Sequence, residues 1–266
     1  MTSRSGDQDD RLAPPHDLED PDLPDIIKKI RERTPARLLA GRSGAAYRTN
    51  TQLDLREAHA AARDAVRAEL NLATDLGDAF VRKWDLFGVS SQATSKDEYL
   101  LRPDLGRHLN DASRAEVSRR CTSNQDLQIM IGDGLSVTAI AAQVPALLPL
   151  LWYGAKARGW SVGQIFVIRY CRVGILNEIG ELLSPKVALL LIGERPGLAT
   201  AESLSAYLAY QPKASDNDAN RNLLSNIHAR GVGTEQAASR ILNFVHSMLQ
   251  TKTSGFQLRE ELPSLP

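Results

Sequence analysis

Apolar residues occur in blocks along this chain. Three of these blocks have the same pattern, in which an apolar run stops at a glycine-rich polar turn. The three segments are Leu127 to Asp133, Ile165 to Val173 and Val187 to Gly197. Apolar runs of this length, rich in Val, Ile and Leu and without alternation, are typical of strands buried on both faces of a parallel sheet. Ligands of such sheets bind beyond the carboxyl ends of the strands. We therefore expect a functional site at the turns that end these runs.

Helical spacing of apolar residues follows each run. The pattern predicts a helix over 136–144 that breaks at Pro145 and resumes over 146–158, a crossover helix over 175–183, a helix from Thr200 through Tyr207, and a last helix from Thr234 to about residue 249. Repeated strand–helix units give an open, doubly wound parallel sheet of about four strands, of the Rossmann or flavodoxin-like kind. The expected fold class is α/β.

The region before residue 121 has a different pattern. It predicts a helix from about residue 51 past Leu70, with His59 as a packed, hydrogen-bonded side chain on its apolar stripe. A short strand or turn is expected over 84–89, and helices on either side of Pro103. We therefore divide the chain into a disordered acidic tail (1–25), a helical N-terminal region (26–120) and an α/β domain (121–266) that binds the ligand.

Charge is unevenly placed near the N-terminus. Residues 1–25 contain eight acidic side chains, two arginines and four prolines, so this tail cannot bury enough apolar surface to fold alone. Between Lys28 and Arg48 the charge inverts, with seven cations and one acid. Both a solvated face and a contact with an anion or a partner chain remain open for this segment, since the glycines at 41 and 44 permit a close backbone approach.

The totals exclude several classes of protein. Lys plus Arg and Asp plus Glu are both 32, so a zero net charge gives no support for a nucleic-acid partner. No run approaches the ~18 consecutive apolar residues of a membrane helix, and the acidic N-terminus does not resemble a secretory signal. The cysteines Cys121 and Cys171 lack metal-site spacing and fit a reducing cytoplasm. We expect a soluble cytoplasmic protein with no nucleic-acid or membrane partner.

Phosphate-loop and zinc-protease motifs are missing. The sequence contains no GxGxxG or GxxxxGK[ST] phosphate loop and no HExxH, and its five histidines are scattered. Glu178 and Glu181, three apart on the predicted crossover helix, are interpreted as a solvated face. No catalytic side chain and no metal site are therefore expected from composition and spacing.

The loops at the strand ends remain as candidates. Asp133 lies between two glycines, and it either accepts hydrogen bonds from a ligand or caps the helix that follows; both interpretations stay open. Glu194 follows a buried run in a loop stiffened by Pro196, and it either presents its carboxylate to a ligand or pairs with Arg195 to hold the turn. Arg172 ends the second run at the same edge.

Several short motifs, in this order, resemble the small (light) subunit of adenosylcobalamin-dependent ethanolamine ammonia-lyase. They are TPAR at 34–37, GRSG at 41–44, YLLRPDLGR at 99–107, DGLS at 133–136, RV at 172–173, EIGE at 178–181, LIGERPGL at 191–198, SL at 203–204, Tyr207, and SNIH at 225–228. The resemblance extends from about residue 34 to the C-terminus. The most specific motifs are GERPG and the segment at 99–107.

The resemblance implies a subunit of a carbon–nitrogen lyase that converts ethanolamine to acetaldehyde and ammonia by radical chemistry. In this family the small subunit joins a large TIM-barrel subunit, adenosylcobalamin lies between the two, and the assembly is a hexamer of heterodimers. The large subunit holds the substrate. Some of these lyases lie in a bacterial microcompartment, so docking of the tail and residues 26–33 onto its shell is a further hypothesis.

Carried over to this sequence, the cobalamin contacts of the family fall at Val173, Glu194 and Leu223. Backbone groups at Val173 can meet the corrin's amides, and Glu194 can accept hydrogen bonds from amide or ribose donors. Members of the family carry cysteine where this chain has Leu223, so a side-chain hydrogen bond is lost there; leucine either packs against the corrin or belongs to the core.

The resemblance also bears on how the cofactor is held. The sequence contains no DxHxxG, the motif by which other cobalamin proteins supply a histidine ligand to cobalt. We therefore expect adenosylcobalamin to keep its own dimethylbenzimidazole on cobalt, in the base-on form. The alternative function is a stand-alone nucleotide-binding or regulatory module that uses the loops at Gly134 and Gly193.

Overall fold

The computed structural model describes residues 24–32 and 42–259, in two compact units, Met1–Leu55 and Arg56–Pro266. In the first unit, α1 (Asp25–Glu32) is a short helix, and β1 (Arg42–Ser43) and β2 (Ala46–Tyr47) form an antiparallel hairpin. Of the expected acidic tail, residues 1–23 lie outside the described residues, and so does the TPAR motif. The role of the basic segment 28–48, which is described only in part, stays a prediction.

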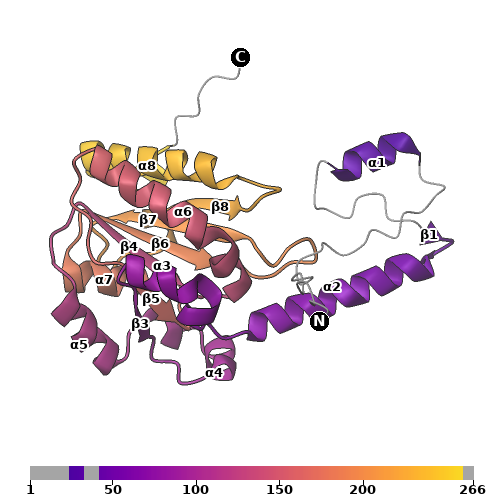
Figure 1. Cartoon of the computed structure of the whole chain (residues 1–266), viewed down its shortest axis with the longest axis horizontal. Coiled ribbons are helices and arrows are strands. Elements are labelled where there is room, and N and C mark those ends of the chain that lie inside the picture. The colour runs from indigo at the N-terminus through magenta and orange to yellow at the C-terminus, as the bar shows by residue number, and fades with distance from the viewer. Residues whose placement is uncertain (1–23, 33–41, 260–266) are drawn as a thin grey trace, which may run out of the picture. The chain divides into compact units, whose positions relative to one another are not determined.

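A six-stranded sheet forms the framework of the second unit (Figure 1). Its strands in chain order are β3 (Phe87–Ser90), β4 (Leu127–Gly132), β5 (Phe166–Arg169), β6 (Val187–Gly193), β7 (Leu204–Tyr210) and β8 (Asn222–Ile227). Their order across the sheet is β3-β5-β4-β6-β7-β8. The first four strands are parallel, and β7 and β8 are each antiparallel to their neighbours.

The α/β class and the three buried strands are confirmed, because β4 and β6 are buried at every position and β5 at all but its last. The strand expected over 84–89 is also present, as β3. It pairs with β5, so the sheet includes part of the region before residue 121. The doubly wound, Rossmann or flavodoxin-like arrangement stays a prediction.

Helices connect the strands. The α-helices of the second unit are the end of α2 (Thr49–Arg67), α3 (Asp78–Lys83), α4 (Lys96–Leu101), α5 (Asp111–Arg120), α6 (Val137–Ala157), α7 (Ile175–Leu183) and α8 (Thr234–Thr251). Short helical turns are η1 (Ala73–Gly77), η2 (Leu105–Arg107), η3 (Asp218–Asn220) and η4 (Gly255–Gln257).

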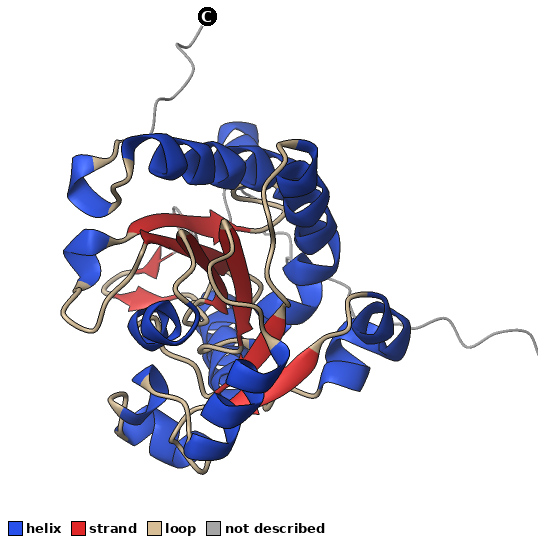
Figure 2. Cartoon of the chain, turned by 90° about the vertical axis from the view of Figure 1, so that its left-hand side faces the viewer, coloured by secondary structure: helices blue, strands red, loops and turns tan. Residues whose placement is uncertain are grey.

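Helices cover both faces of the sheet (Figure 2). Because successive side chains of a strand point to opposite faces, each buried strand supplies two clusters. Ile129 and Leu189 belong to the cluster that includes residues of α6 and α8. Met130 and Leu190 belong to the cluster that includes residues of α5 and α7. The sheet is therefore buried from both sides, which explains why its central strands show no polar alternation.

The helix expected from Thr200 through Tyr207 is wrong. Residues Leu204–Tyr210 form β7, which pairs with β6 along seven residue pairs. Thr200 does accept a hydrogen bond from the backbone N–H of Glu202, but within a turn. Without β7, strand β6 would be an open edge of the sheet. Pairing with β7 satisfies the backbone N–H and C=O groups of both strands, and this outweighs the local helix signal of residues 200–207.

The helix break expected at Pro145 is also wrong, since α6 runs unbroken from Val137 to Ala157 with Pro145 and Pro149 inside it. The two prolines are four residues apart and half-buried, so both rings lie toward one side of the helix. The opposite side is buried against the sheet and α8, and this packing offsets the cost of the lost hydrogen bonds. Among the described residues α6 is the helix long and apolar enough to span a membrane, but it packs as a core helix.

The prediction that His59 is a packed core side chain is wrong as well. His59 is exposed, and none of the residues of α2 is buried. The expected helix is present as α2, and its apolar residues do share one side. Within the described part of the chain, however, no surface buries that side.

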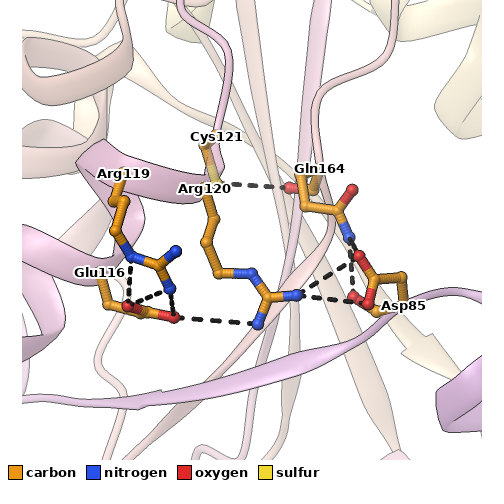
Figure 3. Close-up of polar contacts among 6 residues, drawn as sticks. All are labelled: Asp85, Glu116, Arg119, Arg120, Cys121 and Gln164. Atoms are coloured by element: carbon orange, nitrogen blue, oxygen red, sulfur yellow. Dashed lines mark hydrogen bonds and ion pairs between the residues drawn. The ribbon is translucent and has the colours of Figure 1, made fainter.

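Polar contacts fasten the amino edge of the sheet (Figure 3). The guanidinium of Arg120, at the end of α5, lies 4.1 Å from the ring centre of Phe87 in β3 and pairs with Asp85 at 3.2 Å. The amide of Gln164, which precedes β5, donates to the backbone oxygen of Asp85 at 2.7 Å. Burial raises the pKa of the neighbouring Cys121 thiol to about 11, so that thiol stays protonated and unreactive. These contacts hold α5 and the segments that precede β3 and β5 together, and we call them the Arg120 clamp.

Candidate functional site at the carboxyl edge of the sheet

Asp133, directly after β4, is fully buried and serves the fold. Its carboxylate accepts hydrogen bonds from the backbone N–H groups of Tyr170 (2.8 Å) and Cys171 (2.9 Å), so it holds the loop that follows β5. Burial raises its pKa, while the Lys96 ammonium and these N–H donors act in the opposite direction. The cap of α6 is Ser136, whose hydroxyl accepts from the N–H of Ala139. Neither interpretation of Asp133 from the sequence is therefore correct.

The glycines at the ends of β4 and β6 let two loops touch. Gly134 has a φ of +56°, and a Cβ there would lie 2.3 Å from the backbone oxygen of Gly193. A Cβ on Gly193 would lie 2.0 Å from the backbone oxygen of Ser136. Both glycines are needed for loop-to-loop packing. This close contact leaves no room for a ligand's phosphate between the two loops, so it gives the stand-alone nucleotide-binding module no support.

The segment 99–107 holds the loop after β5 from the other side. The Tyr99 hydroxyl donates to the backbone oxygen of Cys171 at 2.8 Å, and the Arg172 guanidinium lies 4.3 Å from the centre of the Tyr99 ring. Burial raises the pKa of Tyr99, which keeps the phenol protonated as a donor. A Cβ on Gly106 would lie 2.6 Å from Cγ of Arg172. The YLLRPDLGR motif is thus a brace that fixes the strand end at which Val173 lies.

Val173 is half-buried and packs against the hydrophobic cluster beneath α7. Its backbone oxygen accepts from the N–H of Leu176, in the first turn of α7. Its own N–H donates to no atom of the described residues. A backbone donor at a helix start is thereby left for an acceptor outside the chain, such as an amide oxygen.

Glu194 links three strands at the edge where β6 ends. One carboxylate oxygen accepts from the Ser205 hydroxyl (2.7 Å) and the backbone N–H of Asn226 (2.8 Å), and the other accepts from the Ser203 hydroxyl (2.6 Å). The residue is half-buried, and no ion pair joins it to Arg195 among the described residues. A carboxylate offers about four acceptor positions, so one remains for an outside donor.

Leu223, in β8, has 47% of its surface exposed, so the interpretation of a core residue is wrong. It pairs with Tyr207 of β7 in the sheet register, and cross-strand neighbours point to the same face. Tyr207 packs against the cluster beneath α7, as Val173 does. Burial, followed by the charges of Asp218 and Glu194, raises the pKa of Tyr207. Val173 and Tyr207, the cross-strand neighbour of Leu223, thus pack against the same cluster, and Glu194 binds Ser205, two residues before Tyr207 on β7.

Two charged residues of this region were not recognised from the sequence. Glu178 is buried, contrary to the solvated face expected; it accepts from the N–H of Leu109 at 2.8 Å and pairs with Arg114. Its apolar neighbours on α7 were the available signal, since a solvated face would not carry Ile175 and Ile179 beside it.

Arg221, just before β8, is the second. Its side chain is 6% exposed, pairs with Asp218 and donates to Asn177 Oδ1 at 2.8 Å. Its Nε is buried and has no hydrogen-bond partner in the described part of the chain, and burial lowers its pKa. Nothing in its sequence neighbourhood signals burial, because α7 supplies the surface that covers it.

Metal ligands do not gather at this edge. Across residues 24–32 and 42–259, no three His, Cys, Asp or Glu side chains are grouped so as to hold a metal ion. The site is a surface of backbone donors, one carboxylate and exposed apolar side chains. Such a surface can bind a large, amide-rich ligand.

Comparison with known proteins adds a family. Residues 24–259 match the family described as ethanolamine ammonia-lyase light chain. The chain is 42% identical over 231 residues to the ethanolamine ammonia-lyase small subunit of Clostridium perfringens and to that of Fusobacterium nucleatum, covering 87% of this chain and 76% of each relative. It is 39% identical over 230 residues to the small subunit of Clostridioides difficile, covering 86% of this chain and 76% of that one.

Proposed function

This chain belongs to the ethanolamine ammonia-lyase light-chain family, and from that premise we propose that it binds adenosylcobalamin at the interface with the large subunit. Membership as a small subunit implies a lyase complex and a large-subunit partner. The observation that supports the proposal is that β7 links the three residues: Tyr207 is the cross-strand neighbour of Leu223 and packs against the same cluster as Val173, and Ser205 binds Glu194.

The residues at this edge fit the chemistry of a corrin. The periphery of adenosylcobalamin carries amides, which need both donors and acceptors, around an apolar macrocycle. The N–H of Val173 and the remaining acceptor position of Glu194 supply the two polar complements. The exposed side chain of Leu223 supplies apolar surface, replacing the hydrogen bond of a cysteine with contact area.

Under this proposal the chain positions the cofactor and excludes water from one side of it. Adenosylcobalamin, when bound, supplies the radical that starts the conversion of ethanolamine to acetaldehyde and ammonia. Under the same proposal, the catalytic side chains belong to the large subunit. Asp133, Tyr99 and Arg172 contribute indirectly, because they fix the loop that presents Val173.

We also propose that the cofactor is bound base-on. His228 lies close to Glu194, because the backbone N–H of Asn226 donates to Glu194 and the side chain of Asn226 contacts His228. Both ring nitrogens of His228 are hydrogen-bonded. Nε2 contacts Asn226 Oδ1 at 2.8 Å, and Nδ1 accepts from the N–H of Arg230 at 3.3 Å. His228 is therefore poorly placed to replace dimethylbenzimidazole on cobalt. An EPR spectrum of the cob(II)alamin complex should show coupling to the nitrogen of dimethylbenzimidazole, and coupling to a histidine nitrogen would refute this.

The assembly and location are proposed from the family alone. We propose a hexamer of heterodimers in the cytoplasm, within a bacterial microcompartment where the host builds one. The mass of the purified complex, measured by light scattering, tests the stoichiometry. Fractionation of cells that express a fluorescent fusion, with and without residues 1–33, tests the location.

Co-expression with a large subunit tests the function. The two chains should co-purify, and ammonia release from ethanolamine with adenosylcobalamin should require both. Glu194→Gln should then raise the concentration of cofactor needed for half-maximal activity, since it removes an acceptor without changing side-chain size. A chain that remains alone, binds a nucleotide and leaves ammonia release unchanged would establish the stand-alone module instead.

A further inference from the structure

Helix α2 is amphipathic, but no surface among residues 24–32 and 42–259 fully buries its apolar side. None of its nineteen residues, Thr49 to Arg67, is buried. Most of the stability of a protein helix comes from packing of its apolar face, and a helix without such packing is marginal in water. The α/β body does not supply that packing. A partner outside the described residues is therefore needed to account for this helix.

The apolar face of α2 consists of residues at spacings of three and four. They are Leu55, Ala58, Ala62, Ala65 and Val66, which we call the α2 face. Alanines between two larger side chains permit a close approach of another helix. All five members of the α2 face are half-buried, whereas Ala60, on the opposite side, is exposed.

Most charged side chains of α2 lie on the side opposite the α2 face. At 100° per residue, Arg56, Arg63 and Arg67 lie together there, with Glu57 and Asp64 beside them. Asp54 borders the α2 face. The α2 face is therefore an apolar strip on an otherwise polar helix.

The carboxyl end of α2 is fastened to the edge of the sheet that carries the proposed cofactor site. Arg67 pairs with Asp97 at 2.8 Å. Glu69, two residues further on, pairs with Arg169 at 3.2 Å and accepts from the Tyr170 hydroxyl at 3.0 Å. Arg169 ends β5, Tyr170 follows it, and both precede Val173. A subunit that closes over the cofactor at this edge thus meets the base of α2.

We propose that the α2 face is a docking surface for the large subunit, continuous with the contact at the cofactor edge. The inference rests on the proposed function in one respect, the position of the cofactor interface. The large subunit is favoured over a second copy of this chain for two reasons. The relatives are named small subunits, which implies a larger partner chain, and the anchor of α2 adjoins the edge at which the proposed function places that partner. A second copy of this chain is the competing outcome.

A matched pair of substitutions on α2 tests the proposal. Ala62→Glu places a carboxylate in the α2 face, and Ala60→Glu places the same group on the opposite side of the same helix. Each variant is co-expressed in the full chain with the large subunit, and the affinity is measured by biolayer interferometry. Ala62→Glu should weaken association by roughly tenfold or more, because a charge is buried at an apolar interface. Ala60→Glu should bind as the wild type does, and the thermal unfolding of both isolated chains should match the wild type.

The outcomes separate this inference from the proposed function. Wild-type association with equal affinity for the two variants would overturn the docking surface and leave the function intact. A lowered unfolding temperature of Ala62→Glu in the isolated chain would show that the face packs within the chain, which also overturns the proposal. A change confined to the mass of the isolated chain would assign the face to a second copy. Failure of the wild type to bind the large subunit would remove both claims.

Discussion

At the scale of single residues, Glu194 has two tasks. Its carboxylate joins β6 to β7 and β8 through three donors, and it keeps one acceptor position at the edge of the sheet. The sequence indicated that a stiff loop presents this carboxylate, and the pairing with Arg195 was the competing interpretation. The structure replaces that pairing with hydroxyl and backbone donors that come from residues 203–226. Partners that distant could not be identified from local spacing.

Glu194→Ala should lower the free energy of unfolding by about 1–3 kcal/mol, because two hydroxyls and one N–H lose their acceptor. Urea titration followed by circular dichroism measures this. Glu235→Ala, an exposed carboxylate in the first turn of α8, is the control and should change stability by less than about 0.5 kcal/mol. Equal effects of the two substitutions would mean that Glu194 does not cross-link the strands.

His228 gives the fold a dependence on pH. Burial, followed by the charge of Arg230, lowers its pKa from the ordinary value of 6.5. The unfolded chain therefore binds a proton more readily than the folded one, so stability is full above about pH 6.5 and declines as pH falls toward the folded pKa.

The urea midpoint at pH 5.5 should therefore lie below that at pH 7.5, and His228→Gln should reduce the difference. His246→Gln, which alters an exposed histidine, should keep the full difference. If the His228 variant retains the wild-type dependence, another group is responsible.

At the scale of elements, hydrophobic pattern located the strands but not every helix. The buried runs of β4, β5 and β6 and the bounds of α7 follow from the sequence, because burial on both faces leaves an unbroken apolar run. The sequence predicts a helix where β7 lies, because Thr200 and Glu202 form a plausible helix start. The backbone groups at the edge of β6 favour a strand there instead, and this edge exists only once the sheet has formed. Likewise the prolines of α6 are tolerated because its opposite side is packed.

The Arg120 clamp is an element-scale contact that binds α5 to the amino edge of the sheet. Arg120→Ala should lower the free energy of unfolding by about 1–2 kcal/mol, because it removes a stacked cation from Phe87 and an ion pair with Asp85. Arg119→Ala is the matched control: that side chain is 70% exposed and pairs only within its own helix, so less than about 0.5 kcal/mol is expected. A similar loss in both variants, measured by urea unfolding, would contradict the clamp.

At the scale of the whole molecule, the sequence predicts the class of fold, since that follows from buried parallel strands; the position of the site at their carboxyl edge stays a prediction. The sequence does not predict the two antiparallel strands, and Leu223 lies on one of them. The family resemblance supplies Leu223 as a candidate site residue without assigning it to an element. Nor does the sequence show that no residue of α2 is buried, because amphipathic spacing predicts a partner without saying on which chain it lies.

The most direct test of the account is the affinity of the assembled two-subunit complex for adenosylcobalamin, measured by calorimetry for two exposed leucines. Leu223 and Leu150 are 47% and 39% exposed, and the second lies on α6, against the other face of the sheet. We predict that Leu223→Asp raises the Kd by roughly tenfold or more while Leu150→Asp leaves it within about twofold of the wild type. Equal affinities in the two variants would contradict the assignment of the cofactor to this edge of the sheet.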